Sequence, residues 1–353
     1  MSKAAELAAL IGSQTALSNR NMIINGGMTV DQRNGGSSVT PTADQTYVLD
    51  RFGAGLSVAS KFSLEQTTTV PAGFENSMKA TVVSAYTPGS AEWFGFFHKV
   101  EGLNASHLDF GTSDAKTLTL SFWVRSSVTG DYGFSLANSA QNRAYPVLYN
   151  ISAADTWEHK TITIAGDTSG TWLTTNGIGL NLLWSLGAGS SYLQTANAWG
   201  TGLGLGTTGQ TNWISNAAAT FYITGVQLEV GETATPFEHR SFGDELAKCQ
   251  RYFAVLQDTT AAYAGAFGYC NSTTKTKVCF PLGVALRANP TVNVTAATID
   301  IRNNGTNTAA ASVSAAIAQG TNLYLDVNAA SGLATNHACG IDPKQNMTFD
   351  SEL

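Results

Sequence analysis

Polar and apolar residues alternate along most of this chain, the pattern typical of β-strands with one buried face. In KTLTLSFWVRSS, the apolar half of the alternation consists of Leu118, Leu120, Phe122 and Val124. The pattern recurs in KATVVSAY, YGFSLAN, HKTITIAG, IGLNLLW and TFYITGVQLEV. Turns rich in Gly, Asn, Asp and Thr separate these segments, and no long helical pattern lies between them. We therefore predict an all-β domain of antiparallel sheets, packed as a β-sandwich or jelly roll, over residues 20–238.

Strand patterns return near the C-terminus, within residues 254–353. They are found in YAGAFGYC, KTKVCFPLG, PTVNVTAATIDI and NLYLDVNAA. We predict a second, smaller β-sandwich for this region. Internal repeats with a period of roughly 20 to 50 residues are not evident, which argues against a β-helix or a propeller.

Helical periodicity is found at the N-terminus, in residues 1–19. Apolar residues recur there at three- and four-residue spacings, and Gly12 is a stop signal. A helix of about two turns is not stable alone in water. We expect this segment to anchor the chain to a larger assembly or to its own copies through Leu7, Leu10 and Ile11; a frayed terminus is the alternative.

A second helical pattern lies in VQLEVGETATPFEHRSFGDELAKCQRYF, residues 226–253, which also contains five acidic side chains. Ser241 is suited to cap a helix, with Asp244 three residues later. The apolar stripe of this helix consists of Phe242, Leu246, Cys249 and Phe253. We predict a connector helix over residues 239–253, with the stripe packed at a domain or subunit interface.

The acidic residues of this stretch could instead indicate an active site or a metal site. Glu238 and His239 are adjacent, so in an extended segment they point to opposite sides. Asp244 and Glu245 are explained by the positive N-terminus of the helix. We therefore interpret the stretch as a structural joint and predict no catalytic residue in it.

Metal and cofactor signals are weak in the rest of the sequence. The five histidines are scattered, and the cysteines Cys249, Cys270, Cys279 and Cys339 do not follow a zinc-binding spacing. We expect reduced, buried cysteines, with a Cys270–Cys279 bridge across a hairpin as the alternative. No cofactor is predicted. Loop aspartates of a jelly roll can hold structural calcium, so a calcium site stays open without assigned residues.

Composition narrows the possible partners. The 353 residues are 43% hydrophobic and only 12% charged, and the net charge is -6. Without a run of Lys and Arg, nucleic-acid binding is not expected. No apolar stretch approaches the roughly 18 residues that span a bilayer, and the N-terminus lacks the features of a signal peptide. This profile is typical of β-rich virion or extracellular proteins.

The sequence contains no complete catalytic or phosphate-binding motif of the kinds considered below. A G-x-S-x-G signature is absent. The glycine-rich run GTGLGLGTTGQ, residues 200–210, resembles a phosphate loop, but it lacks the following Lys-Ser/Thr and the start of a helix. We predict a surface loop. No pair of carboxylates stands out as a glycosidase pair.

Aromatic residues among Gly and polar residues are the strongest functional signal. Flat rings stack on the apolar faces of sugars while amides meet the hydroxyls. A tryptophan on a strand, such as Trp184, is more often a core residue than a platform for a ligand. The candidates for glycan binding are Trp199, Tyr192, Trp213 and Asn197.

Five segments in this order resemble a family of tailed-bacteriophage fibre and virion appendage proteins. They are RNMIINGGMTVDQRN (20–34), YVLDRF (47–52), LTLSFWVRSSVTGDYGFSLAN (118–138), WEHKTITIAGDTSGTW (157–172) and FYITGVQLEVGETATPFEHRSFGDELAKCQRYF (221–253). The resemblance implies a carbohydrate-binding-like jelly roll followed by a variable C-terminal domain, commonly in a homotrimer on the virion. The framework positions that it carries over are Asn25, Gly26, Met28, Gln32, Arg33, Asp50, Arg51, Gln227, Glu229, Pro236, Arg240, Cys249, Gln250 and Arg251.

The resemblance leads to an expected function. The chain would be a non-enzymatic, homotrimeric fibre subunit of a virion, bound through its N-terminus to a phage tail or capsid protein. Residues 254–353, which lie beyond the resemblance, would form a tip domain, and the protein would engage a host-surface glycan or receptor. Two alternatives remain open: a capsid-attached fibre or decoration protein with a purely structural role, and a fibre-borne glycan depolymerase.

Overall fold

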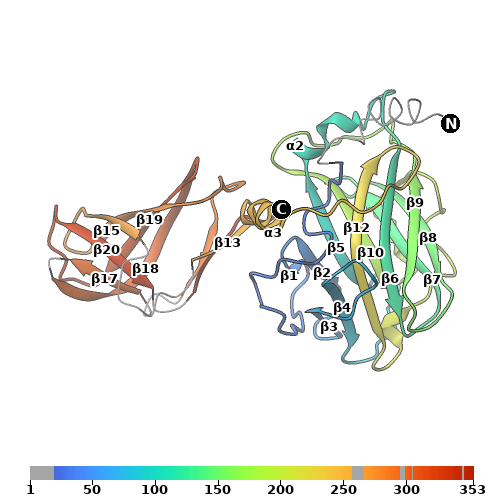
Figure 1. Cartoon of the computed structure of the whole chain (residues 1–353), viewed down its shortest axis with the longest axis horizontal. Helices are drawn as coiled ribbons and strands as arrows, with labels where there is room; N and C mark the ends of the chain where they lie inside the picture. The colour runs from blue at the N-terminus through green and yellow to red at the C-terminus, as the bar shows by residue number, and fades with distance from the viewer. Residues whose placement is uncertain (1–19, 257–265, 295–298, 304, 344–345) are drawn as a thin grey trace. The chain divides into compact units, whose positions relative to one another are not determined.

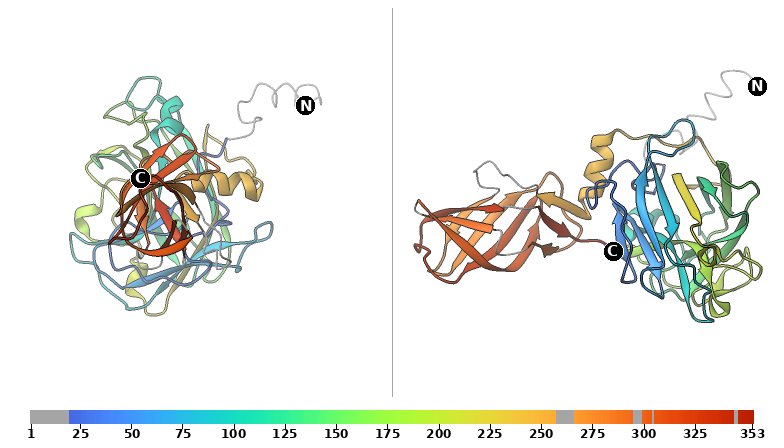
Figure 2. Two further views of the ribbon diagram at one scale, coloured as in Figure 1. Left: turned by 90° about the vertical axis from the view of Figure 1, so that its left-hand side faces the viewer. Right: turned by 90° about the horizontal axis from the view of Figure 1, so that it is seen from below.

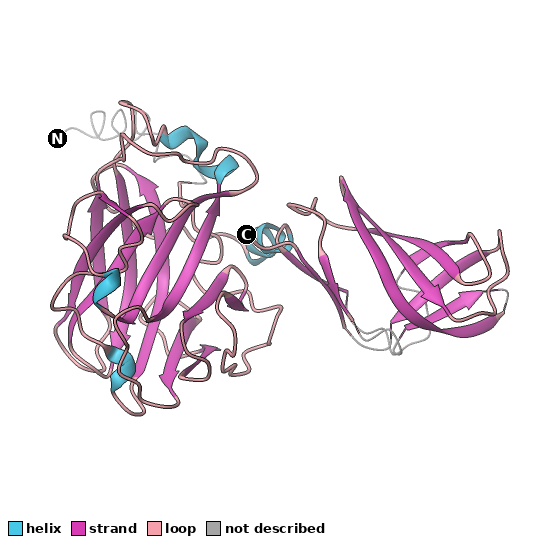
Figure 3. Cartoon of the chain, turned by 180° about the vertical axis from the view of Figure 1, so that it is seen from behind, coloured by secondary structure: helices cyan, strands magenta, loops and turns pink. Residues whose placement is uncertain are grey.

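The computed structural model describes residues 20–256, 266–294, 299–303, 305–343 and 346–353 (Figure 1). The predicted N-terminal anchor, with Leu7, Leu10 and Ile11, lies outside the described residues. The chain divides into two compact units, Met1–Glu245 with Leu353 and Leu246–Glu352. Strands predominate in both units (Figure 3). The all-β prediction is therefore confirmed, and each unit is described below by itself.

The first unit contains a seven-stranded and a five-stranded antiparallel sheet. The order in the larger sheet is β1 (Thr46–Leu49), β2 (Phe52–Leu56), β5 (Trp93–Glu101), β10 (Ile178–Ala188), β7 (Gly130–Ala137), β8 (Arg143–Ile151) and β11 (Gly200–Thr201). The order in the smaller sheet is β3 (Phe62–Thr67), β4 (Ser77–Val82), β12 (Thr220–Val230), β6 (Leu118–Ser126) and β9 (Glu158–Ile164).

The core of the first unit lies between the two sheets. Phe122 of β6 and Trp184 of β10 are fully buried, and their ring centroids are 6.1 Å apart. Phe96 of β5 stacks on Trp184 at 5.2 Å. The alternation in β6 places its apolar residues in this core, as the sequence predicts. The jelly-roll-type sandwich prediction is confirmed, because two antiparallel sheets bury a common apolar layer.

A second apolar layer covers the outer face of the seven-stranded sheet. Phe97, Leu183 and Leu205 are buried in it, and Tyr192 packs against it. Part of the glycine-rich run therefore lies against the sheet, and Gly204–Thr207 is buried. The Gln210 side chain packs on Gly206, where a Cβ atom would lie 1.8 Å from its Oε1, so a larger residue there would require Gln210 to move. The run is a packed loop after the short strand β11, not a phosphate loop.

Helices are short in the described chain. They are α2 (Gly102–Ala105), α3 (Phe242–Gln250) and three 3₁₀ turns, Ser106–Leu108, Ser190–Tyr192 and Trp213–Ser215. None of the helices in the described residues has the length and apolar character needed to cross a membrane.

The connector helix α3 is shorter than the predicted 239–253. Ser241 caps it: the backbone N–H of Asp244 donates to Ser241 Oγ at 3.2 Å, and the Ser241 hydroxyl donates to the Asp244 carboxylate at 2.6 Å. The helix ends at Gln250 because Phe253 already belongs to strand β13 (Phe253–Leu256), where it pairs with Asp350.

The second unit contains a closed antiparallel barrel and a three-stranded sheet (Figures 1 and 2). Around the barrel the order is β14 (Ala266–Cys270), β15 (Lys275–Pro281), β19 (Asn322–Ala329), β18 (Thr306–Gln319), β17 (Ile299–Asn303) and β20 (Ala338–Pro343). The small sheet is β13, β21 (Met347–Asp350) and β16 (Thr291–Asn293). The sequence predicted a small sandwich; strand pairing between β17 and β20 closes the sheet into a barrel instead.

The alternative Cys270–Cys279 bridge is not formed. All four cysteines are free. Phe267 pairs with Cys279 and Cys270 with Thr276, so the two cysteines do not face each other. Cys270 is fully buried in the barrel, whereas Cys279 is only half-buried. Strand alternation thus separates them, because Cys279 shares its face with exposed Lys277.

Candidate functional site

The stretch from Val226 to Arg240 is a hydrogen-bonded joint within the first unit. Glu229 is fully buried and accepts hydrogen bonds from Gln227 Nε2 (2.9 Å) and from the backbone N–H and hydroxyl of Thr235 (2.9 and 2.7 Å). The Arg240 guanidinium lies between the carboxylates of Glu238 and Glu245, each 3.4 Å away. It also donates to the carbonyl groups of Ile23 and Asn21. Glu238 and Glu245 therefore neutralise the charge of Arg240, and Glu229 holds the backbone at Thr235 in place.

The framework positions at the start of the unit belong to the same network. Asn25, with φ of 61°, donates from its side chain to the carbonyls of Val30 and Asp50 at 2.8 and 2.9 Å. Gln32 donates to the carboxylate of Asp50 through both its backbone and its side chain. Gly26 leaves no room for a side chain, because its Cβ atom would lie 2.1 Å from Val226 O. The resemblance therefore rests largely on residues with an architectural role.

A hollow of about 470 Å³ lies beside this joint. The rings of Phe74, Phe237 and His239 face it, with Phe237 and His239 at 4.9 Å. Glu238 also lines it, but its carboxylate accepts a hydrogen bond from Asn21 N–H at 2.8 Å and pairs with Arg240. A carboxylate held in this way is poorly placed as a general base.

Among the described residues, no group of three or more His, Cys, Asp or Glu side chains is placed to hold a metal ion. The sequence left a calcium site open without assigning residues, and the described part of the chain supplies no such cluster.

The four glycan-binding candidates lie in different environments. Trp213 is fully buried in the sandwich core, and its Nε1 donates to Thr220 O at 3.3 Å. The prediction that Trp213 binds a glycan is wrong, because neither face of its ring is accessible to a sugar. Tyr192 is half-buried in the apolar layer over the seven-stranded sheet. Trp199 and Asn197 lie near each other, two residues apart on the loop that leads into β11.

Trp199 belongs to a cluster of aromatic rings at one end of the sandwich. Its ring centroid is 5.2 Å from Tyr145, 5.4 Å from Trp172 and 5.9 Å from Phe110. The indole Nε1 donates to Ala165 O at 2.8 Å. Trp199 is half-buried in this setting. The cluster thus fixes the orientation of the ring and leaves part of it exposed.

The loop that carries Trp172 is held against β8 by an ion pair. Arg143 of β8 donates through Nε and Nη2 to both carboxylate oxygens of Asp167, at 2.8 and 2.6 Å. The hydrogen bond that Arg143 donates to Asp167 raises the pKa of Arg143. Gly170 packs on the stem of Arg143, where a Cβ atom would lie 2.7 Å from Cγ. This bidentate pair rigidifies the loop beside Trp199.

Asn197 lies at the mouth of a polar cleft of about 420 Å³ between β8 and β9. Strand β9 is the last strand of its sheet, and β11 covers β8 only at Arg143 and Ala144. The cleft therefore opens at the edge of the sandwich. Asn150 and Asn197, both exposed, line it together with Lys160. Amide and ammonium groups on an open cleft can donate hydrogen bonds to a ligand rich in hydroxyl groups.

One acid in the cleft has a structural task. The Glu158 carboxylate accepts hydrogen bonds from Ser152 N–H and Oγ and from Ala153 N–H at 2.9 to 3.0 Å, and from Lys160 at 2.5 Å. Burial alone would raise the pKa of Glu158, but these hydrogen bonds outweigh it and lower the pKa to about 2. Glu158 is thus ionised at neutral pH and shapes the floor of the cleft.

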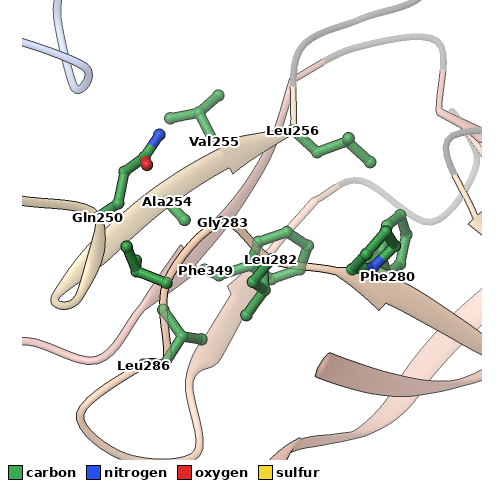
Figure 4. Close-up of a pocket in the computed structure, with 11 residues that line it drawn as sticks. Gln250, Ala254, Val255, Leu256, Phe280, Leu282, Gly283, Leu286 and Phe349 are labelled. Carbon is green, nitrogen blue, oxygen red and sulfur yellow. The ribbon is translucent and has the colours of Figure 1, made fainter. Parts of the chain in front are cut away.

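A third hollow, of about 210 Å³, lies in the second unit (Figure 4). Its lining is apolar except for Gln250, with Phe280, Leu282 and Phe349 among the largest side chains (Figure 4). It lacks the convergent polar groups that a saccharide requires. The candidate site is therefore the edge cleft of the first unit.

The predicted stripe of the joint helix is only partly covered. Phe242 is 60% exposed and Leu246 is half-buried, whereas Cys249 and Phe253 are buried. Their role at a domain or subunit interface stays a prediction.

Several exposed or half-exposed aromatic residues are not among the candidates predicted from the sequence. On the outer face of the five-stranded sheet, half-buried Trp123 lies 5.1 Å from the ring of His159. In the second unit, Phe267 and Tyr324 are exposed on the barrel. Strand alternation around Val124 and Val278 could have indicated that these residues face outward.

The fold and the cleft define an all-β sandwich with a polar cleft at its edge. No family model and no curated protein matches the chain. Among solved structures, it is similar to the enzymatically active domain of tailspike protein 4 of bacteriophage CBA120, with 12% identity, a TM-score of 0.33, and coverage of 60% of this chain and 21% of the tailspike chain. The matched part thus spans about a fifth of that protein.

Two carbohydrate-binding modules are similar at the same level. The CBM22-1 xylan-binding domain from Paenibacillus barcinonensis shares 11% identity, with a TM-score of 0.28 and coverage of 57% of this chain and 99% of that one. The family 11 module from Clostridium thermocellum, solved with a mixed-linked tetrasaccharide, shares 14% identity, with a TM-score of 0.27 and coverage of 57% and 98%. Similarity this low assigns neither a family nor a ligand to the chain.

Proposed function

We propose that this chain is a non-enzymatic subunit of a tailed-phage fibre or virion appendage that binds a host-surface glycan. The subunit is homotrimeric, is located in the virion and attaches through its N-terminal segment to a tail or capsid protein. The order of five segments over residues 20–253, which resembles this class of proteins, supports the assembly role. The low share of charged residues, 12%, agrees with it.

The observation that carries the glycan proposal is the cleft between β8 and β9. Exposed amides of Asn150 and Asn197 line it. The half-buried ring of Trp199 does not line the cleft but follows Asn197 by two residues. A saccharide would stack on the accessible part of Trp199, and the cleft amides would hydrogen-bond its hydroxyl groups. An open, shallow site of this kind gives weak binding per copy, which three copies can raise through avidity.

A glycan array with the full chain, followed by titration of the best soluble oligosaccharide, tests this proposal. We expect Trp199→Ala to bind at least about tenfold more weakly, a loss of about 1.4 kcal/mol. Asn197→Gly removes the amide and keeps the positive φ of 59° accessible, and it should also weaken binding. Tyr192→Ala is the matched control, because this half-buried aromatic residue lies over the seven-stranded sheet.

Three results would change the proposal. No binding on the array would refute glycan recognition. Equal losses for Trp199→Ala and Tyr192→Ala would place the site elsewhere. Sustained release of reducing ends from host polysaccharide would favour a depolymerase over a binding protein.

A further inference from the structure

Four large apolar side chains of the second unit are exposed on neighbouring barrel strands. The exposed fractions are 71% for Phe267, 51% for Tyr269, 43% for Tyr324 and 54% for Ile317. A contiguous exposed apolar patch of this kind is often functional in soluble proteins. This surface is independent of the cleft in the first unit.

Strand register aligns these residues. Phe267 of β14 pairs with Cys279 of β15, Cys279 pairs with Tyr324 of β19, and Tyr324 pairs with Ile317 of β18. Phe267, Cys279, Tyr324 and Ile317 thus form one line across four strands, which we call the apolar row. With strand spacings of about 4.8 Å, the row is roughly 15 Å long. Tyr269 extends it, two residues further along β14.

The row itself contains no charged residue. Strand β18 has 14 residues and none of them is charged. Lys275 and Asp326, on the strands of the row, form an ion pair at 2.7 Å. On the other side of the barrel, Arg302 of β17 pairs with Asp342 of β20 at 2.7 Å. Charged residues therefore lie beside the row as well as on the other side of the barrel, but the row itself contains none.

The chemistry of the row fits protein better than sugar. A sugar site needs strong hydrogen-bonding groups between its rings, but the residue between the rings of Phe267 and Tyr324 is Cys279, a weakly polar thiol. The row ends at Ile317, an aliphatic side chain. Cores of protein interfaces are rich in aromatic residues and poor in charge. The same face carries exposed Lys277 beside its cross-strand partner Asp326. When two copies meet through this face, the Lys277 of one copy can therefore pair with the Asp326 of the other.

The area of the row agrees with a role in association. Its aromatic residues and Ile317 leave roughly 400 Å² of apolar surface exposed, if each large side chain presents about 200 Å² when free. A stable interface buries about 800 Å² on each partner. The row can therefore form the apolar centre of such an interface, with Lys277 and Asp326 at its rim.

We infer that copies of this chain associate through the apolar row of the barrel. The occupant of the row is a second copy of the chain. This inference rests on the homo-oligomeric part of the proposed function and names the surface that holds the copies together.

Light scattering of the full chain during size exclusion tests it. The wild type should elute as an oligomer, and Phe267→Asp should elute with the mass of one chain. Val83→Asp is the matched control, because Val83 is an exposed apolar residue (58%) in the first unit. Circular dichroism of both variants checks that the fold is intact. Since Phe267 projects into solvent, its replacement should not disturb the barrel.

Thiol labelling gives a second readout. Cys279 is half-buried in the single chain, whereas Cys249, Cys270 and Cys339 are buried. Burial raises the pKa of Cys339, although its hydrogen bond with Thr276 opposes this rise, so its thiol is a poor nucleophile. We expect maleimide to label Cys279 more slowly as protein concentration rises, and Phe267→Asp to abolish this dependence.

The outcomes separate this inference from the proposed function. A monomeric wild type at micromolar concentration would refute both the inference and the homotrimer. An oligomer that survives Phe267→Asp would refute the row and leave the homotrimer standing. Loss of binding to a soluble monovalent glycan in folded Phe267→Asp would identify the row as a sugar platform and would refute the inference.

Discussion

Replacing Trp213 with alanine separates a core tryptophan from a binding tryptophan. Trp213 is fully buried in the first unit, and its ring centroid is 6.4 Å from that of Phe221. Loss of a buried aromatic side chain costs about 3–5 kcal/mol. In a domain of roughly 200 residues, each kcal/mol lowers Tm by about 2–4 °C. We therefore expect Trp213→Ala to lower the Tm of the first unit by roughly 6–20 °C.

Trp199→Ala should affect binding more than stability. The ring of Trp199 is only half-buried, so its loss removes less buried apolar area, and the fall in Tm should be about half of that for Trp213→Ala. Differential scanning calorimetry of the full chain measures both values, and titration with the glycan measures binding. Trp213→Ala should keep its affinity at temperatures where it is folded, whereas Trp199→Ala should lose it. A Trp213→Ala protein with unchanged Tm and weakened glycan binding would refute the assignment of Trp213 to the core.

Two further predictions concern charged groups. Arg240→Met leaves the carboxylates of Glu238 and Glu245 without their shared cation. Denaturant unfolding should show that the first unit is destabilised by about 3–5 kcal/mol. A change below about 1 kcal/mol would contradict the structural role of Arg240 in the joint. Glu158 has its pKa lowered from 4.5 to about 2, so its contribution is present above pH 4.5 and is lost as the pH falls towards 2. The stability difference between wild type and Glu158→Gln should therefore shrink over this range, and a constant difference would contradict the hydrogen bonds at Glu158.

Burial on both faces weakens the period of two, but an apolar run can still indicate a strand. IGLNLLW and TFYITGVQLEV are predicted as strands, although nearly all residues of β10 and β12 are buried. Strand β6 alternates in burial at its C-terminal end, and its apolar residues match the predicted pattern. In WFGFFHKVE, which forms β5, eight of nine residues are buried. A second apolar layer covers Phe97 on the outer face, so the period of two disappears from the sequence. No strand was predicted there.

The candidate site was predicted only in part, because its exposure depends on tertiary packing. Trp199 and Trp213 both follow asparagines and small residues, yet only Trp213 enters the core. Asn150 was missed because the edge position of β8 depends on which strands pair with it. The closure of the barrel likewise depends on pairing between β17 and β20, which are far apart in the sequence. Local patterns do not determine such long-range register.

The cleft and the apolar row together make a quantitative expectation about avidity. If the row holds copies together, breaking it leaves each cleft chemically unchanged but removes the second and third contacts of one particle with a surface. Phe267→Asp should then bind a soluble oligosaccharide with wild-type affinity, while its apparent affinity for a dense glycan surface falls by about 10² or more. Surface plasmon resonance on high- and low-density chips measures the two cases. Equal apparent affinity on the dense chip would mean that the copies cannot engage neighbouring glycans at once, and association through the row would then have no part in recognition.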